Sequence, residues 1–464
     1  MKVAIYTLGC KVNQYETQAM EQTLRAKGHQ VVEFSNEADA YVVNTCSVTA
    51  VSDQKSRQVI HRVQKQHPAA VVAVCGCYPQ THPEDVRKLG ADLIAGTGDR
   101  EGFVSLLEEA AAGKKNLEAI DKSFERRVFE VLPAGGMGGR TRAMLKIEDG
   151  CVNFCTYCII PYARGPVRSL PMEQAVEQTA QLAAEGYREI VLTGIHISSY
   201  GIDFDEEAWK RGESVSVLKE DEERRDYSGS SKLIDLLERI HDIEGIERIR
   251  IGSLEPRIVT EETAARMAEL PKLCPHFHLS LQSGCDATLR RMNRKYTSEE
   301  YAESVALLRK VFDHPAITTD VIVGFPGETE EEFAQTKEFL DRIQFFEMHI
   351  FKYSKRAGTR AAVMSHQVPD PVKTTRSAEL LAMEKEQSKQ FRTHYVGREA
   401  EVLPEETKEI GGTEYLLGHT RDYVKLAVSV KENKKNVANT VICGRVQGFL
   451  TDEILLLSPL EFSK

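Results

Sequence analysis

Three cysteines lie within eight residues near the middle of the chain, at Cys151, Cys155 and Cys158. Their spacing, C-x3-C-x2-C, supplies three thiolates, and cubane iron-sulfur clusters take Cys ligands. Three ligands leave one of four irons open, just as catalytic zinc sites keep an open position that structural sites close. A zinc knuckle without its fourth ligand, or three unrelated buried thiols, are the alternatives. Because short ligand spacings in a reducing compartment favour metal, the spacing predicts a cluster with one reactive iron.

Four more cysteines follow short apolar runs in the first hundred residues. Cys10 ends the first run, Cys46 the second, and Cys75 and Cys77 the third. The Val/Ile-rich runs cover residues 2–8, 39–43, 69–74 and 91–95, with helix-like sequence at 16–26 and 53–66. This alternation is typical of a doubly wound parallel sheet, in which sites form outside the carboxyl ends of the strands. The cysteines are therefore expected to converge on a second three-thiolate site, unless each is an ordinary buried thiol.

The choice between Cys75 and Cys77 as third ligand stays open at this point. Residues two apart on a strand point to the same side, so spacing does not separate the two thiols.

Composition limits the setting in which these thiols act. The chain has ten cysteines in 464 residues, too few for a disulfide scaffold, and its first ten residues carry one lysine and no signal-peptide pattern. No apolar run approaches the ~18 residues that a membrane span needs. We expect a reduced, cytoplasmic protein of two or three domains at ~150 residues each, without a membrane role.

Six further apolar runs follow in the middle of the chain. They cover residues 144–147, 189–197, 248–254, 276–281, 317–324 and 347–351, and helix-like sequence separates most of them, as at 172–185 and 298–312. Six strand-helix units are two short of a full eight-fold barrel, and such barrels place their sites at the carboxyl ends of the strands. Cys274, His276, His278 and Cys285 lie around the fourth run, where core or site-edge roles are favoured over a metal site.

The last seventy residues read as five short strands. The strands are expected at residues 398–403, 414–418, 423–428, 439–446 and 449–457, after a connecting helix at 372–393. Five strands at this spacing predict a small closed barrel of the OB type, which often binds nucleic acid. Nine Lys/Arg against eleven Asp/Glu from residue 394 onward give no overall basic footprint, although Lys431, Lys434 and Lys435 could contact phosphates.

Two segments have no hydrophobic period. The linker at 119–142 holds a glycine tract at 134–139 that lacks the strand and the Lys-Ser/Thr of a phosphate-binding loop, so a flexible connection is favoured. Its arginines either contact an RNA backbone or are simply solvated; they are Arg126, Arg127, Arg140 and Arg142. The segment at 203–226, with the single Trp209, carries ten acidic against five basic residues. It is either a lid or, as charge runs usually are, a solvated acidic excursion.

The motifs together resemble a known family. C-x3-C-x2-C resembles the radical S-adenosylmethionine (radical SAM) signature, in which the open iron chelates the amino and carboxylate groups of SAM and the aromatic residue before the last cysteine, here Tyr157, lies beside the adenine. With Thr7-Leu-Gly-Cys-Lys-Val-Asn-Gln-Tyr-Glu16, Asn44-Thr-Cys46 and Gly76-Cys77, the chain looks like the methylthiotransferases, which carry a second 4Fe-4S cluster in an N-terminal domain. The family's Gly-Cys pattern falls on Cys77, which leaves Cys75 as an extra thiol.

The resemblance covers essentially the whole chain and implies an α/β architecture in several parts. These are an N-terminal doubly wound parallel sheet (1–118), a linker (119–142), an open six-unit (βα) radical SAM partial barrel (143–370) with the acidic insertion 203–226, a connecting helix (371–393) and a small all-β TRAM domain, an OB-like barrel (394–464). It also implies SAM contacts at Thr193, Gly194, Ser280, Gln282, Arg291, Asp320 and Gly324.

The implied reaction is methylthiolation. One-electron reduction of the first cluster cleaves SAM to methionine and a 5'-deoxyadenosyl radical, which removes hydrogen from C2 of a modified adenine. A second 4Fe-4S cluster on Cys10, Cys46 and Cys77 holds the sulfur that SAM methylates and that is then inserted. An external one-electron reductant and a sulfur donor are required, and the sequence identifies neither.

The implied substrate is a tRNA anticodon loop. The Gly-Cys-Lys-Val-Asn-Gln-Tyr-Glu version is similar to the type that modifies N6-threonylcarbamoyladenosine next to the anticodon of tRNA. Related types act on isopentenyladenosine in tRNA or on an aspartate of a ribosomal protein, and both are kept as alternatives. The third alternative is a non-catalytic iron-sulfur RNA-binding protein. A fully ligated cluster would suffice for such a protein, so the open-iron spacing speaks against it.

Overall fold

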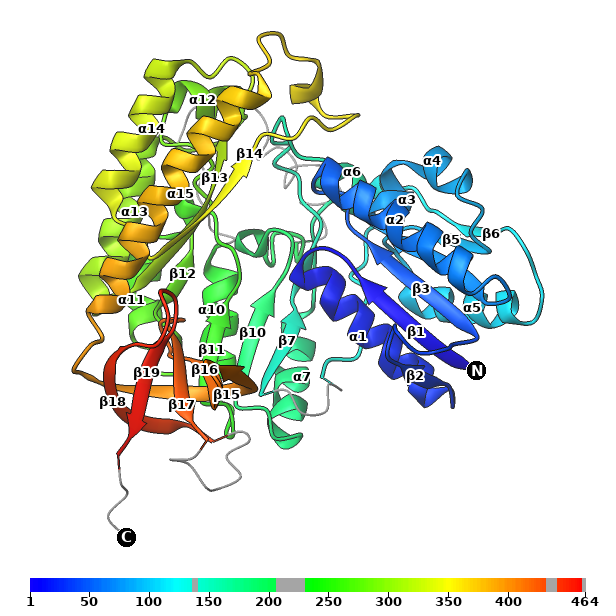
Figure 1. Cartoon of the computed structure of the whole chain (residues 1–464), viewed down its shortest axis with the longest axis horizontal. Helices are drawn as coiled ribbons and strands as arrows, with labels where there is room; N and C mark the ends of the chain where they lie inside the picture. The colour runs from blue at the N-terminus through cyan, green and yellow to red at the C-terminus, as the bar shows by residue number, and fades with distance from the viewer. Residues whose placement is uncertain (136–140, 206–229, 431–439, 461–464) are drawn as a thin grey trace.

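Three units stand side by side in this computed structural model, which describes residues 1–135, 141–205, 230–430 and 440–460 (Figure 1). An α/β unit holds the N-terminus, an open barrel follows, and a small closed β-barrel lies at the lower end of the open barrel. The expected fold class is confirmed. Several sequence predictions fall outside the described residues: most of the acidic insertion with Trp209, most of the glycine tract, Arg140, and the lysines at 431, 434 and 435.

The N-terminal unit is a six-stranded parallel sheet in the order β2-β1-β3-β4-β5-β6. Its strands are β1 (Lys2–Thr7), β2 (Gln30–Val32), β3 (Ala40–Thr45), β4 (Val71–Gly76), β5 (Leu93–Ala95) and β6 (Leu117–Ala119). Its helices are α1 (Lys11–Ala26), α2 (Ala50–Gln66), α3 (Cys77–Thr81), α4 (Pro83–Arg87) and α5 (Arg100–Ala111). Apolar residues of α1 and α5 pack on one face of the sheet and those of α2 on the other, so the sheet is doubly wound.

The middle unit contains one strand in each of the six predicted runs. Strands β7, β10 and β11 form one parallel sheet and β12, β13 and β14 another, and bridges from Ile249 to Leu273 and from Leu254 to Leu279 join the two. The bounds are β7 (Arg142–Lys146), β10 (Glu189–Thr193), β11 (Arg248–Ile251), β12 (His276–His278), β13 (Ala316–Val323) and β14 (Glu347–Lys352). The short pair β8 (Glu148–Asp149) and β9 (Arg168–Ser169) follows β7.

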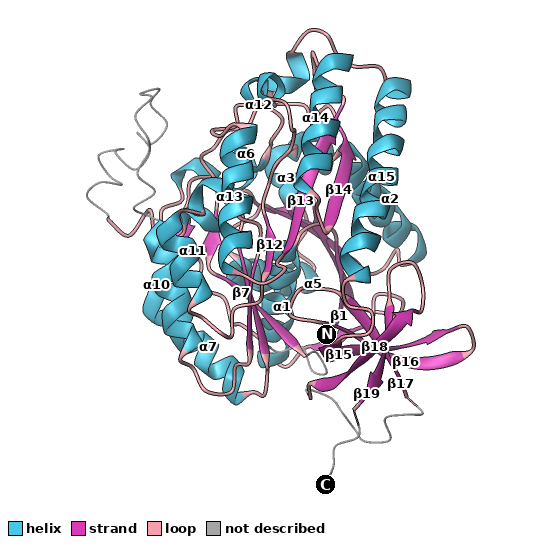
Figure 2. Ribbon diagram, turned by 90° about the vertical axis from the view of Figure 1, so that its left-hand side faces the viewer, coloured by secondary structure: helices cyan, strands magenta, loops and turns pink. Residues whose placement is uncertain are grey.

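Helices cover the outside of this open barrel (Figure 2). They are α7 (Met172–Ala184), α10 (Ser230–His241), α11 (Glu261–Ala268), α12 (Asp286–Arg291), α13 (Ser298–Val311) and α14 (Glu330–Ile343), whereas the short α6 (Ile160–Arg164) packs against α3 of the N-terminal unit. Thr260, Thr297 and Thr329 each begin a helix with a reciprocal capping box, which satisfies backbone N–H groups that the first turn leaves unpaired.

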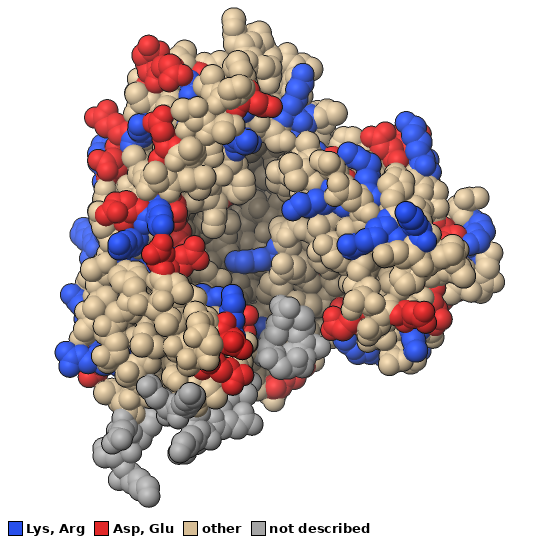
Figure 3. All heavy atoms as spheres, in the orientation of Figure 1, with Lys and Arg blue, Asp and Glu red and all other residues tan. Residues whose placement is uncertain are grey.

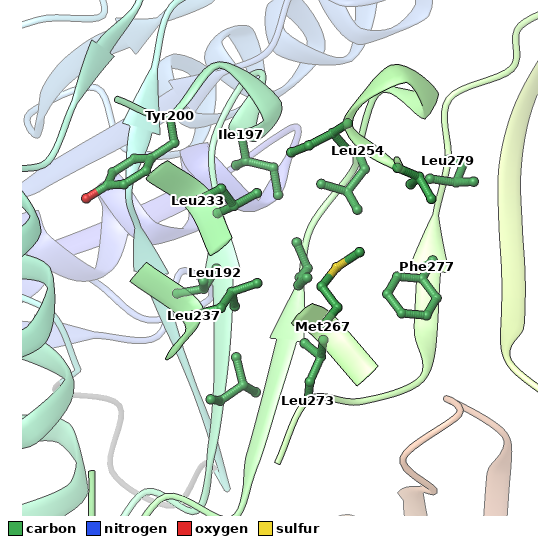
Figure 4. Close-up of a cluster of buried hydrophobic side chains, with 14 of the residues drawn as sticks. Leu192, Ile197, Tyr200, Leu233, Leu237, Leu254, Met267, Leu273, Phe277 and Leu279 are labelled. Carbon is green, nitrogen blue, oxygen red and sulfur yellow. The ribbon is translucent and has the colours of Figure 1, made fainter. Parts of the chain in front are cut away.

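Residues of the barrel strands alternate between an apolar outer face and a polar inner face. Leu192 and Phe277 lie on the outer face, where they pack with residues from α10 and α11 such as Leu237 and Met267 (Figure 4). The residues between them on the same strands have the opposite orientation, because successive side chains of a strand point to opposite sides. The inner face therefore carries charged and polar groups, among them Arg142, Glu189, Arg250, His276, His278 and Asp320.

The C-terminal unit is a closed five-stranded barrel in the order β15-β16-β17-β19-β18, as the sequence predicted. Its strands are β15 (Glu399–Ile410), β16 (Thr413–His419), β17 (Lys425–Ser429), β18 (Ile442–Phe449) and β19 (Leu455–Pro459), and α15 (Asp370–Thr393) leads into it. Two buried arginines of β11 fasten it to the open barrel: Arg248 donates to the carbonyl oxygen of His419 at 2.9 Å and Arg250 to that of Arg421 at 2.9 Å. The small barrel thus closes the amino-terminal end of the large one.

A buried ion cluster joins the N-terminal unit to the open barrel. The carboxylate of Glu16 on α1 is fully buried and accepts a hydrogen bond from Arg100 at 2.8 Å, and Lys146 of β7 lies 3.4 Å away. Arg164 of α6 donates to it with both terminal nitrogens. Buried charges need such full pairing, because removing them from water is costly. No helix among the described residues meets the length and hydropathy that a membrane span requires.

Replacing Glu16 by Gln is expected to destabilise the fold by about 3 to 5 kcal/mol, because it leaves buried guanidinium groups without their counter-charge. Chemical denaturation of the variant measures the loss. The matched control is Glu21→Gln on the same helix: Glu21 pairs with the exposed Arg25 at 3.3 Å, and its loss is expected to cost at most about 1 kcal/mol. Equal effects of the two substitutions would contradict the central role of Glu16.

The same carboxylate predicts a pH dependence. Burial raises the pKa of Glu16, but Arg164, Arg100 and Lys146 outweigh it and lower the pKa from 4.5 to about 2. A carboxyl whose pKa is lowered by folding stabilises the folded state above pH 4.5, and this contribution is lost as the pH falls from 4.5 toward 2. Denaturation midpoints measured across that range are expected to fall more steeply for the wild type than for Glu16→Gln.

Candidate functional site

The central cysteines lie in a loop after β8 that is held in place by backbone contacts. The N–H of Cys151 donates to the carbonyl oxygen of Gly165 at 3.0 Å, and that of Thr156 to Met292 at 3.0 Å. Cys151, Cys155 and Cys158 are free thiols of intermediate exposure. Burial is the main effect that raises the pKa of Cys158 to about 12, and the neighbouring Cys155 is the second. The same two effects raise the pKa of Cys151. Three thiols in one loop, two of them with raised pKa, fit a metal cluster, whose positive charge stabilises thiolates.

Arg294 contacts this loop and was missed by the sequence analysis. Its Nη1 lies 3.2 Å from Sγ of Cys155, and its Nε donates to the hydroxyl of Tyr296 at 2.9 Å. The hydroxyl of Tyr296 donates in turn to the carbonyl oxygen of Ser280, one of the expected SAM contacts. A buried guanidinium beside a thiolate stabilises its negative charge. Nothing in the local sequence around Arg294 marks it, because its partner is 139 positions away.

Glu148 lies beside Cys151 with one carboxylate oxygen unpaired. Its Oε2 accepts from the N–H of His196 at 2.6 Å, while its buried Oε1 has no hydrogen-bond partner among the described residues. Burial raises the pKa of Glu148 well above its ordinary value of 4.5. A Cβ on Gly194 would come within 2.8 Å of Glu148 Oε2, so the expected SAM residues Thr193 and Gly194 meet Glu148 at the end of β10. The unpaired acceptor fits an N–H donor such as the amino group of SAM, which keeps its N–H bonds when its nitrogen binds iron.

The remaining expected SAM contacts come from several elements: Ser280 and Gln282 follow β12, Asp320 and Gly324 lie on and directly after β13, Arg291 ends α12, and Tyr157 lies in the cysteine loop. Tyr157 packs edge-on against Phe325 at 6.4 Å, next to Gly324, and Gln282 adopts a left-handed backbone with φ 73°. Arg291, however, forms an ion pair with Glu332, in which Nη1 of Arg291 lies 2.9 Å from Oε1 of Glu332. Asp320 faces the barrel interior, 3.5 Å from His278.

His278, Asp320 and His349 form a polar trio on neighbouring strands of the inner face. Their ligand atoms lie within 4.8 Å of one another, and of the His, Cys, Asp and Glu groups that the structure describes this is the one that could hold a single metal ion. Cys274 and Cys285, which the sequence placed near His278, are buried elsewhere and do not join it.

The N-terminal cysteines meet at the carboxyl ends of β1, β3 and β4. Cys10 is exposed at the start of α1, and the buried Cys46 follows β3. A Cβ on Gly9 would lie 2.7 Å from Cβ of Cys46, so the two loops touch. Burial raises the pKa of Cys77 to about 12. The charge of Arg164 opposes this rise, whereas the neighbouring Cys46 and Cys10 add to it. The three cysteines thus lie at the same edge of the sheet, and the cluster expected on them stays a prediction.

The structure separates Cys75 from Cys77. Cys75 is still on β4 and packs in the core with Val3 and Phe103, whereas Cys77 comes after the strand and begins α3. Gly76 makes the turn with φ 102°, where a Cβ would lie 2.5 Å from the carbonyl oxygen of Thr45. The expectation that both thiols point the same way is therefore wrong, because strand alternation stops at Gly76.

Side-chain hydrogen bonds join the two cysteine sites, and a hollow lies between the units that carry them (Figure 3). Arg164 donates to Oδ1 of Asn13 at 2.8 Å, and Nδ2 of Asn13 donates to the carbonyl oxygen of Thr45 at 2.9 Å, so the helix after Cys158 is tied to the loops of Cys10 and Cys46. In Figure 3 the hollow opens between the N-terminal unit and the other two units, and Lys and Arg atoms are visible within it. Its inner end is a cavity of about 450 Å³ where all three units meet.

Two family models match parts of the chain. The Radical SAM superfamily matches residues 145–340, and Uncharacterized protein family UPF0004 matches residues 2–96. The solved structures of the radical S-adenosylmethionine methyltransferase TsrM from Kitasatospora setae and of the cobalamin-dependent radical enzyme OxsB are similar in fold. TsrM has a TM-score of 0.51 at 15% identity over 75% of this chain and 72% of its own, and OxsB has 0.52 at 12% over 83% and 61%.

Curated relatives match along nearly the whole chain. Threonylcarbamoyladenosine tRNA methylthiotransferase MtaB of Bacillus subtilis is 41% identical over 433 residues, 93% of this chain and 91% of the relative. MtaB of Aquifex aeolicus is 37% identical over 87% and 92% of the two chains. A tRNA-2-methylthio-N(6)-dimethylallyladenosine synthase of Pelotomaculum thermopropionicum is 33% identical over 90% of each. The chain therefore belongs to the radical SAM methylthiotransferases, within them to the MtaB type.

Proposed function

We infer that this protein methylthiolates C2 of the adenine in N6-threonylcarbamoyladenosine of tRNA. The observation that carries this conclusion is the 41% identity to a relative named for that activity, over about nine-tenths of each chain. A relative named for dimethylallyladenosine also matches, at 33% identity, so the experiment below separates the two nucleosides.

Membership in the family assigns SAM and one 4Fe-4S cluster, and we place that cluster on Cys151, Cys155 and Cys158. We propose a second 4Fe-4S cluster on Cys10, Cys46 and Cys77, supported by the interaction of these three thiols at the strand ends. When bound, the clusters and SAM supply the one-electron cleavage of SAM, the removal of hydrogen from C2 and the sulfur and methyl groups that are added. A one-electron reductant and a sulfur donor complete the proposed set of partners.

The chain's own residues bind and orient these groups. Glu148 offers its unpaired oxygen to the amino group of SAM, beside Thr193 and Gly194, and Arg294 stabilises the thiolate of Cys155. Further proposed SAM contacts are Tyr157, Ser280, Gln282, Asp320 and Gly324. Arg291 stays a proposed contact only if its guanidinium leaves Glu332.

The tRNA anticodon loop offers unstacked bases that a protein can draw into a pocket. We propose that the adenine enters the hollow between the units and that the C-terminal barrel, a TRAM domain, contacts the surrounding RNA. The boundaries 1–118, 143–370 and 394–464 remain those proposed from the sequence. A tRNA substrate also implies a cytoplasmic location.

Nucleoside mass spectrometry of tRNA tests the substrate. In cells that lack the gene, the methylthio form of threonylcarbamoyladenosine is expected to disappear, and wild type but not Cys77→Ala is expected to restore it. The outcome against the proposal is persistence of that nucleoside together with loss of methylthio-isopentenyladenosine, which would retain the chemistry and change the substrate.

Iron content tests the two clusters separately. After anaerobic reconstitution the wild type is expected to hold about eight irons per chain, and removal of either cysteine trio to leave about four. Cys75→Ala is the matched control, since Cys75 packs in the core two residues from Cys77, and it is expected to keep about eight. Retention of about eight irons after loss of Cys10, Cys46 and Cys77 would rule out the second site.

A further inference from the structure

Lys11 lies at the inner end of the hollow, directly after Cys10. It lines the cavity of about 450 Å³ together with Gln14 on the same helix face. The opposite wall comes from the strands of the open barrel, with Met144 and Val191, and from the C-terminal barrel, with Tyr423. Met144, Val191 and Tyr423 form the apolar part of a lining that otherwise consists of polar and charged groups, Lys11 among them.

The arginines near this cavity are already neutralised. Three guanidinium groups of β7 and β11 face three carboxylates, in the ion pairs Arg142–Glu405 (2.5 Å), Arg248–Glu401 (2.9 Å) and Arg250–Glu189 (2.9 Å). The remaining acid of the cavity wall, Glu406, pairs with Lys425 at 3.2 Å. The cations and the carboxylates of these ion pairs are therefore equal in number.

The ammonium of Lys11 has no counter-charge among these ion pairs. It makes no ion pair or hydrogen bond with any residue that the structure describes, and its side chain is exposed to the cavity that it lines. A cation without a counter-charge, next to neutralised arginines, favours an anionic ligand, because ionised partners form the stronger hydrogen bonds.

The aromatic wall limits the size and shape of that ligand. The ring of Tyr423 is stacked with His276 and with His419, at centroid distances of 4.7 Å and 4.3 Å, and the guanidinium of Arg250 lies 4.8 Å from its centroid. These contacts hold the ring in place. A carboxylate on a small aliphatic unit fits both the charge and the wall.

We propose that this cavity binds the threonyl carboxylate of the substrate nucleoside, with the ammonium of Lys11 as its partner. The inference rests on the proposed function and goes further, since it names the residue that distinguishes a threonylcarbamoyl from a dimethylallyl group. The former ends in a carboxylate and the latter is a hydrocarbon. Leaving a carboxylate desolvated without a partner is costly, so the site selects by charge.

The test pairs substitutions in the enzyme with a change in the substrate. Anticodon stem-loop RNA carrying threonylcarbamoyladenosine is compared with the same RNA whose threonine carboxylate is a carboxamide, and kcat/KM for methylthiolation is measured for wild type, Lys11→Met and Lys11→Arg. Lys11→Met is expected to lose about 10- to 100-fold on the acid and little on the amide, because only the acid loses a charged partner. Lys11→Arg is expected to retain most activity on the acid.

Iron content and a second lysine serve as controls. Lys27→Met, just beyond the other end of α1, removes a surface pair with Glu108 and is expected to act like the wild type on both RNAs. An equal loss on acid and amide, a fall in iron content of Lys11→Met, or no loss on the acid would each overturn the inference. Wild type that methylthiolates neither RNA but acts on the isopentenyl form would refute the proposed function, and this inference with it.

Discussion

The buried ion cluster around Glu16 is the constraint on which the rest of the site depends. Three cations from α5, α6 and β7 converge on one carboxylate that has no contact with solvent. Because each unpaired charge there would carry a large desolvation cost, the elements that bear the charges can meet in few ways. α1 starts directly after Cys10 and α6 starts two residues after Cys158, so fixing these helices to each other also fixes the two cysteine sites. Chemistry that passes from one site to the other needs that fixed separation.

The open barrel supplies the second constraint. Its strands alternate apolar and charged residues, as in Arg248-Ile-Arg-Ile251, so the outer face fills with helices while the inner face carries guanidinium and imidazole groups. Charged groups at the amino-terminal end need partners, and the C-terminal barrel provides them through Glu401 and Glu405 and through the carbonyl oxygens of His419 and Arg421. The small barrel is therefore part of the site's wall as well as a candidate RNA-binding unit.

Periodicity predicted most of the strands and the closed five-stranded barrel; motif spacing predicted the cysteine clusters, which stay predictions. Both signals come from residues that are close together in the sequence, so they can be recognised without knowledge of the fold. The three-residue edge strands β2 and β6 were missed because so short a run has no readable alternation. Glu148, Arg294 and the surplus charge of Lys11 were missed for another reason: their roles come from partners that are distant in sequence or absent from the chain. The choice of Cys77 over Cys75 required the turn at Gly76, which spacing alone cannot show.

The first turns of α1 combine both constraints in one helix. Asn13 and Glu16, three residues apart, point into the protein and bind Arg164, whereas Lys11 and Gln14, also three residues apart, are exposed to the hollow. Residues at that spacing share a helix face, so the anchor and the hollow-facing pair occupy separate faces of the same turns. Side chains on the exposed face can change without disturbing the ion cluster that holds Cys10 in position. Under the proposed function, α1 positions the N-terminal cysteine site and also recognises the substrate. Selectivity can therefore evolve on this helix while the distance between the two cysteine sites stays fixed.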